Sequence, residues 1–215
     1  MFSHLTSNQN TPPALQGSPS LNASKSARCP VLPKPPLGAV KDGEEVTVAF
    51  NTIGYEAFGN LYLNITNRCS ANCVFCIRHF SDGVYGYNLR LSREPSEEEI
   101  LREIERLDLA HYKEVVFTGF GEPTCRFDGL LRITAWLSKK GLHVRLDTNG
   151  HAALMYPGRD VVAELKTAGL DAVSVSLNAE SQEKYNWLCK PVFKGRVAPH
   201  IRLTEGATFL ARCFV

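Results

Sequence analysis

Three cysteines on one short loop are the residues whose types and spacing could do chemistry in this sequence. Cys69, Cys73 and Cys76 have three and then two residues between them, directly after the apolar run 61–66. That run has the composition of a buried strand, so the loop leaves the carboxyl end of a strand. Three thiolates can hold three irons of a cubane iron–sulfur cluster, whose fourth iron has no protein ligand. The spacing therefore predicts a cluster with one iron open for chemistry.

A zinc site is the alternative for the same cysteines. His79 follows Cys76 with two residues between them and would complete a Cys₃His set. Structural zinc sites more often take their ligands from two separated pairs. Cys125, Cys189 and Cys213 occur singly, and such cysteines are more often small buried apolar residues than ligands.

The loop must be positioned by an alternation of strands and helices. Apolar runs predict strands at 61–66, 114–118, 142–146 and 172–177, with short strands at 46–50 and 53–58 before them. Helices are expected from the capping box at 96–99, at 127–140 before Gly141, at 161–168 before Gly169, and at 181–189 before Pro191. Strands that alternate with helices form right-handed parallel units, so their polar ends meet at one carboxyl edge. The fold class is α/β.

Polar motifs follow each strand at that edge and resemble the radical S-adenosylmethionine (radical SAM) superfamily. The spacing of the three cysteines, with aromatic Phe75 before the third, matches the family. Phe120 replaces the first glycine of a family Gly-Gly-Glu element. The other matching segments are Gly121-Glu122-Pro123, Thr148-Asn149-Gly150 and Ser176-Leu177-Asn178-Ala179. Residues 61–69 and the run Tyr185-Asn186-x-x-Cys189-Lys190-Pro191 look most like the TatD-associated radical SAM subgroup.

This resemblance implies a partial (βα) barrel, a [4Fe-4S] cluster on the three cysteines, and S-adenosylmethionine (SAM) on the open iron. Phe75 would contact the adenine, and Gly121 and Glu122 the methionyl ammonium. Asn149, Ser176 and Asn178 would bond the ribose or the methionyl carboxylate. An electron from a flavodoxin- or ferredoxin-like protein would cleave SAM to a 5′-deoxyadenosyl radical, which abstracts a hydrogen from an unknown substrate. The subgroup's name suggests an association with a TatD-type nuclease.

The C-terminal part departs from the family pattern. Residues 194–215 are too short for two further strand–helix units, so we expect about four βα units with the last strands missing. We expect a disordered tail at 1–44, an incomplete core at 45–193 and a divergent tail at 194–215. A second hypothesis follows, in which the chain is a truncated or inactive iron–sulfur or zinc binding domain without turnover.

Composition limits the other function classes. A formal net charge of +2 over 215 residues gives no whole-chain argument for nucleic acid. Seven cysteines, three of them crowded in one loop, do not look like a secreted disulfide framework. We find neither a membrane-spanning stretch nor a secretory signal, and residues 1–41, without acidic residues, only partly resemble a transit peptide. A cytoplasmic protein is expected.

Overall fold

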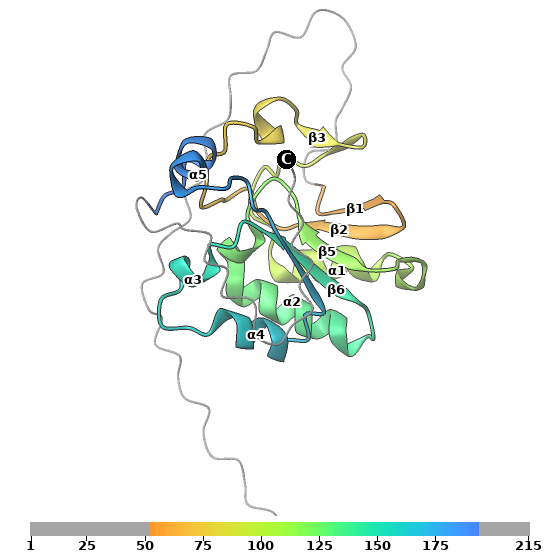
Figure 1. Cartoon of the computed structure of the whole chain (residues 1–215). Coiled ribbons are helices and arrows are strands. Elements are labelled where there is room, and N and C mark those ends of the chain that lie inside the picture. Colours follow the sequence, from red (N-terminus) through yellow and green to blue (C-terminus); the bar gives the residue numbers. More distant parts are fainter. Residues whose placement is uncertain (1–51, 194–215) are drawn as a thin grey trace, which may run out of the picture.

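A computed structural model describes residues 52–193 and shows a five-stranded mixed sheet with helices packed on one face (Figure 1). The strand order is β1-β2-β5-β6-β7. β1 pairs antiparallel with β2, and the remaining pairs are parallel. The strands are β1 (Gly54–Ala57), β2 (Asn60–Asn64), β5 (Val115–Thr118), β6 (Val144–Thr148) and β7 (Ala172–Val175).

The helices are α1 (Glu97–Glu105), α2 (Phe127–Lys139), α3 (Ala152–Met155), α4 (Val161–Thr167) and α5 (Gln182–Cys189). The helices α1 to α4 lie between these strands along the chain and contribute to the core beside the sheet, whereas α5 follows β7 and packs against the cysteine loop. One continuous core joins α1, α2 and α4 to alternate residues of the parallel strands, as in Leu63, Phe117 and Leu146. The four parallel strands and their helices confirm the expected α/β fold, a partial (βα) barrel.

Local sequence signals explain where these helices begin and end. Ser96 accepts a hydrogen bond from the Glu99 backbone, and the Glu99 side chain accepts one from the Ser96 backbone, which is the predicted capping box. α5 ends at Lys190 in the left-handed region, with φ 44°, directly before Pro191. Proline removes a backbone donor and stops the helix, as predicted.

Some elements were not predicted from the sequence. Residues 81–93 look like a polar loop but contain a small hairpin of β3 (Gly83–Val84) and β4 (Tyr87–Asn88). Three 3-10 turns were also missed: η1 (Ile77–His79), η2 (Leu109–His111) and η3 (Pro123–Arg126). Elements this short carry too little periodicity to be recognised.

Several predictions lie outside the described residues. These are the strand at 46–50 and the tails at 1–44 and 194–215. Within residues 52–193, no helix is both long enough and apolar enough to cross a bilayer.

Candidate functional site

The cysteine loop leaves the carboxyl end of β2, where the parallel strands also end. Cys69, Cys73 and Cys76 are each partly exposed. Cys76 directly precedes the short turn η1. The loop therefore presents three accessible thiols at the edge of the sheet where α/β proteins place their sites.

Two of the three thiols, those of Cys69 and Cys73, are held in their protonated form. Burial, followed by the charge of Glu122, raises the pKa of Cys69 to about 12. A hydrogen bond with Cys189, followed by burial, raises the pKa of Cys73 well above its usual value, and the charges of Cys69 and Cys76 add to this effect. A metal ligand must be a thiolate, so metal binding here must release protons.

Three thiols on one loop are a donor set that fits a cubane cluster. In residues 52–193, no three side chains of His, Cys, Asp or Glu converge where one metal ion could sit. The three thiols nevertheless lie near one another, because the charge of Cys76 contributes to the raised pKa of Cys69 and the charges of Cys69 and Cys76 to that of Cys73. In a cubane each thiolate binds a different iron, so the three sulfurs need not meet at one point.

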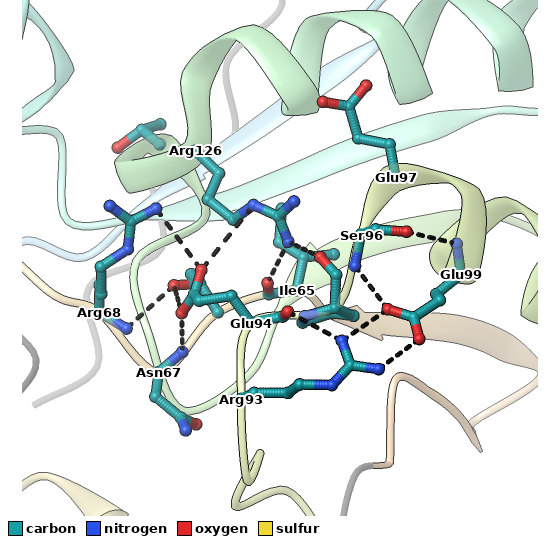
Figure 2. A network of polar contacts seen from close by, with 12 residues as sticks. Ile65, Asn67, Arg68, Arg93, Glu94, Ser96, Glu97, Glu99 and Arg126 are labelled. Carbon is teal, nitrogen blue, oxygen red and sulfur yellow. Dashed lines mark hydrogen bonds and ion pairs between the residues drawn. The ribbon is translucent and has the colours of Figure 1, made fainter.

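The root of the loop is fixed by the carboxylate of Glu94 (Figure 2). Glu94 Oε1 accepts hydrogen bonds from Thr66 Oγ1 at 2.7 Å and from the Asn67 backbone at 3.2 Å. Its Oε2 lies 3.5 Å from Arg68 Nη2 and 3.8 Å from Arg126 Nε. One half-buried acid thus connects three consecutive residues before Cys69 with the residue at the start of α2.

Arg126 strengthens the same connection. Its Nη1 donates to the Ile65 carbonyl at 2.9 Å and to the Pro95 carbonyl at 2.6 Å (Figure 2). These bonds join the end of β2 to the residues before α1. The loop therefore starts from a rigid, charged base.

The chain after β5 packs directly against the residues that precede Cys69, through Gly121. A Cβ at Gly121 would lie 2.3 Å from the Thr66 carbonyl oxygen and 2.5 Å from that of Arg68. The next residue, Glu122, donates its backbone N–H to the Arg68 carbonyl at 2.7 Å. The missing side chain thus allows two backbones to touch. The predicted approach of Gly121 to a methionyl ammonium stays a prediction.

The Glu122 carboxylate is buried and holds two strand ends together. Oε1 accepts from the backbone and hydroxyl of Thr124 at 3.1 and 2.6 Å and from Thr148 Oγ1 at 2.7 Å. Oε2 accepts from the Asn149 backbone at 2.7 Å. Burial raises the pKa of Glu122, and these four hydrogen bonds oppose that shift.

Asn149 lies against the cysteine loop. Its Nδ2 donates to Ser70 Oγ at 3.0 Å and lies 3.8 Å from Cys69 Sγ, while its Oδ1 accepts from the His151 backbone at 3.0 Å. The sequence placed Asn149 at the third strand end, and the structure brings it to the cysteines.

The other predicted residues lie at the same edge with different contacts. Ser176 donates its backbone N–H to the Thr148 carbonyl at 2.9 Å. Asn178 hydrogen-bonds the side chain of Cys189. The Phe75 side chain is 48% exposed, which leaves one face available to a ligand.

The sequence did not indicate that the C-terminal end of α5 would pair with the cysteine loop. Asn72 donates to the Cys189 carbonyl at 2.9 Å and Val74 to the Leu188 carbonyl at 2.8 Å. In the other direction, Val192 donates to the Ser70 carbonyl at 3.0 Å. Residues 188–192, here called the α5 clasp, therefore hold the loop by its backbone. The subgroup motif that ends in Pro191 was the available signal.

Two further buried residues contact the cysteine loop or the residues before it. His151 is 2% exposed, with Nδ1 2.8 Å from Ser70 Oγ and Nε2 2.9 Å from Tyr185 Oη, so it joins the loop to α5. Burial lowers the pKa of His151 to about 4. Arg78 is also buried. Its Nη1 donates to the Asn67 carbonyl, and its charge lowers the pKa of Cys69.

Comparison with known proteins identifies the class that this sheet edge and its cysteines define. The model of the radical SAM superfamily matches residues 63–205, about two thirds of the chain. The chain belongs to this superfamily, whose members use a [4Fe-4S] cluster and SAM.

Individual relatives align with only part of this chain. A probable GTP 3′,8-cyclase of Pyrococcus abyssi is 34% identical over 60% of this chain and 38% of its own length. Fe-coproporphyrin III synthase of Methanosarcina barkeri is 32% identical over 57% of this chain and 28% of its own. A solved structure of TYW1 with a lysine-pyruvate adduct bound aligns with a TM-score of 0.41 and 15% identity, over 62% of this chain and 46% of that one. The chain spans less than half the length of these relatives.

Proposed function

We propose that this protein is a radical SAM enzyme that generates a 5′-deoxyadenosyl radical for hydrogen abstraction. The observation that carries the proposal is the convergence of three strand ends, since Asn149 and Glu122 both reach the loop of the three cysteines. Family membership supports the same conclusion. A single motif could recur by chance, whereas this arrangement requires the fold as well.

Cys69, Cys73 and Cys76 hold the cluster as thiolates in this proposal. A [4Fe-4S] cluster with SAM bound supplies one-electron reductive cleavage of a carbon–sulfur bond. Arg78 and the contacts of Glu94 keep the loop in place, and Arg78 also offsets the negative charge of the thiolates. In this proposal these residues therefore hold the cluster and its loop, independently of any substrate.

The remaining predicted residues hold SAM. Phe75 stacks on the adenine with its exposed face, and Asn149, Ser176 and Asn178 bond the ribose or the methionyl carboxylate. Glu122 acts on the methionyl ammonium chiefly through its charge, because its oxygens already accept four protein hydrogen bonds.

The substrate and partners are proposed only by class. The two named relatives carry different activities although they match overlapping parts of the chain, so neither substrate is transferred. We propose a flavodoxin- or ferredoxin-like reductant, a place in the TatD-associated subgroup, and a core at 45–193 between tails at 1–44 and 194–215. The Tyr185-to-Pro191 motif, which lies beside the cysteine loop, supports the subgroup.

Reductive cleavage of SAM tests the proposed activity. The full chain is reconstituted anaerobically with iron and sulfide and then supplied with SAM and dithionite. We expect 5′-deoxyadenosine from the wild-type chain and none from Cys73→Ala. Equal amounts from both would contradict the enzyme, and a loaded wild-type cluster without product would favour a binding domain that lacks turnover.

A further inference from the structure

The side chain of Cys189 contacts Cys73, one of the three proposed cluster ligands. Cys189 is fully buried at the end of α5, and Cys73 packs against the small core that Cys189 forms with Tyr185. Its sulfur hydrogen-bonds the side chains of Cys73, Tyr185 and Asn178. Cys189 therefore belongs to the immediate surroundings of a ligand, although it lies outside the three-cysteine motif.

The backbone fixes this contact on both sides of Cys73. The preceding residue, Asn72, donates to the Cys189 carbonyl at 2.9 Å, and the following residue, Val74, donates to the Leu188 carbonyl at 2.8 Å. These bonds hold the backbone of Cys73 beside that of Cys189. The fold therefore keeps the two residues adjacent, and the side-chain packing of Cys73 against Cys189 and Tyr185 brings the sulfurs together.

A chain of hydrogen bonds with a defined direction begins at Asn149. Its Oδ1 accepts from the His151 backbone, which orients the amide so that Nδ2 donates to Ser70 Oγ. Ser70 accepts this bond, and its hydroxyl proton is then free to be donated to His151 Nδ1, 2.8 Å away. The imidazole is buried and neutral, so its remaining proton lies on Nε2.

The same chain ends at the two sulfurs. His151 Nε2 lies 2.9 Å from Tyr185 Oη, and in the tautomer with its proton on Nε2 it donates to that oxygen, which leaves the Tyr185 hydroxyl proton available to the Cys189 sulfur. Asn178 hydrogen-bonds that sulfur as well. While both residues are thiols, Cys73 donates this hydrogen bond to Cys189. An iron-bound Cys73 thiolate has no proton to donate, so only the Cys189 S–H can then make the bond, with Tyr185 and Asn178 facing the lone pairs of its sulfur.

We propose that the Cys189 thiol donates a hydrogen bond to the Cys73 thiolate of the cluster and thereby raises the reduction potential of that cluster. The inference rests on the proposed function, because only an iron ligand makes Cys73 a permanent acceptor. Hydrogen bonds to ligand sulfurs are among the terms that set cluster potentials. Reduction adds negative charge, so a donor stabilises the reduced form more than the oxidised form. Cys189 thus acts through Cys73 and does not itself touch the iron.

The test is a redox titration of the full chain, reconstituted anaerobically and studied without SAM. Electron paramagnetic resonance follows the reduced cluster in wild type, Cys189→Ala and Cys189→Ser. One hydrogen bond to a charged sulfur changes the reduction equilibrium about tenfold. Cys189→Ala should therefore lower the potential by about 59 mV. Cys189→Ser keeps a donor and should shift it less.

A matched pair of tyrosine variants provides the second measurement. Tyr185→Phe removes the hydroxyl that faces Cys189 and should lower the potential by less than Cys189→Ala does. Tyr156→Phe removes a hydroxyl that donates to the Thr124 carbonyl at 2.9 Å, and should leave the potential unchanged.

Each result of these titrations either supports or overturns the proposed hydrogen bond. An unchanged potential in Cys189→Ala with about four irons per chain overturns the inference, as does a Cys189→Ser shift that equals the Ala shift. If Cys189→Ala does not take up iron, Tyr185→Phe decides, and the absence of a shift there overturns the inference. A wild-type chain that assembles no cluster overturns the proposed function instead, and this is seen before any variant is measured.

Discussion

The carboxylate of Glu122 accepts the backbone N–H of Asn149 at 2.7 Å and so joins the ends of two neighbouring parallel strands. The same carboxylate accepts three further hydrogen bonds from two threonines. Because an amide offers one acceptor oxygen and turns an NH₂ toward these donors, Glu122→Gln should lower the free energy of unfolding by about 1–3 kcal/mol. Urea unfolding of the full chain measures this. Exposed Glu105→Gln is the control and should change it by less than about 0.5 kcal/mol. Equal effects would contradict a structural role for the carboxylate.

The close approach at Gly121 predicts intolerance of any side chain. Gly121→Ala places a methyl group against the carbonyls of Thr66 and Arg68, so the cysteine loop must shift, at a cost of about 1–3 kcal/mol. Gly54→Ala is the control, since its Cβ would meet the nearest atom, on Leu61, at an ordinary 3.5 Å. Thermal unfolding and iron content after reconstitution measure both variants. A Gly121→Ala protein with wild-type stability and iron content would disprove the close packing.

The contacts of Glu94 predict that its substitution will loosen the residues just before Cys69. Glu94→Gln keeps an acceptor for Thr66 but removes the charge opposite Arg68 and Arg126. All three side chains are partly exposed, so the loss of stability should be only about 1 kcal/mol, while iron uptake slows. Arg93→Gln breaks a more exposed ion pair with Glu99 and serves as the control. Faster proteolysis near residue 68 in Glu94→Gln alone would confirm the role, and equal cleavage of both variants would refute it.

Burial of His151 predicts a pH dependence of stability. Its pKa is lowered to about 4 in the folded chain, against 6.5 for the ordinary side chain. The unfolded chain therefore binds a proton first as pH falls, so this contribution is complete above pH 6.5 and is lost between about 6.5 and 4. The loss can reach about 3 kcal/mol. His151→Gln should flatten this part of the stability curve, measured by urea unfolding across the pH range. The exposed His111→Gln should retain it, and a curve unchanged by His151→Gln would contradict the prediction.

Two exposed phenylalanines near the cysteine loop separate SAM binding from stability. Phe75→Ala should weaken SAM binding to the reconstituted protein about tenfold, because stacking on a base contributes roughly 1–3 kcal/mol. Stability should hardly change, since the side chain is 48% exposed. Phe80, 74% exposed, is the control, and Phe80→Ala should leave the affinity unchanged. Calorimetric titration with SAM measures both. Equal affinities would remove Phe75 from the site.

The sequence predicted the features that short segments determine. The capping box at Ser96, the helix stop at Pro191 and the strand before Cys69 depend on neighbouring residues, and the structure has them. The predicted convergence of Asn149 with the cysteines followed from the rule that parallel strands deliver their ends to one edge.

The sequence could not show contacts that depend on the register between distant segments. Ser70 and His151 are 81 residues apart, and nothing local to either one indicates the bond between them. Glu94 resembled any charged residue before a helix, and Cys189 any isolated buried cysteine. Their roles depend on the loop being folded back against α2 and α5.

The pairing of residues 70–74 with the α5 clasp determines when the cysteine site can be completed during synthesis. The cysteines emerge from the ribosome early, whereas Leu188 and Cys189 emerge only with the end of α5, the last described helix, and Val192 after it. Contacts between such distant segments form late, because closing the intervening chain costs entropy. Iron should therefore be retained only by chains that have been synthesised past Val192. Retention of the cluster then indicates that the loop has paired with the α5 clasp.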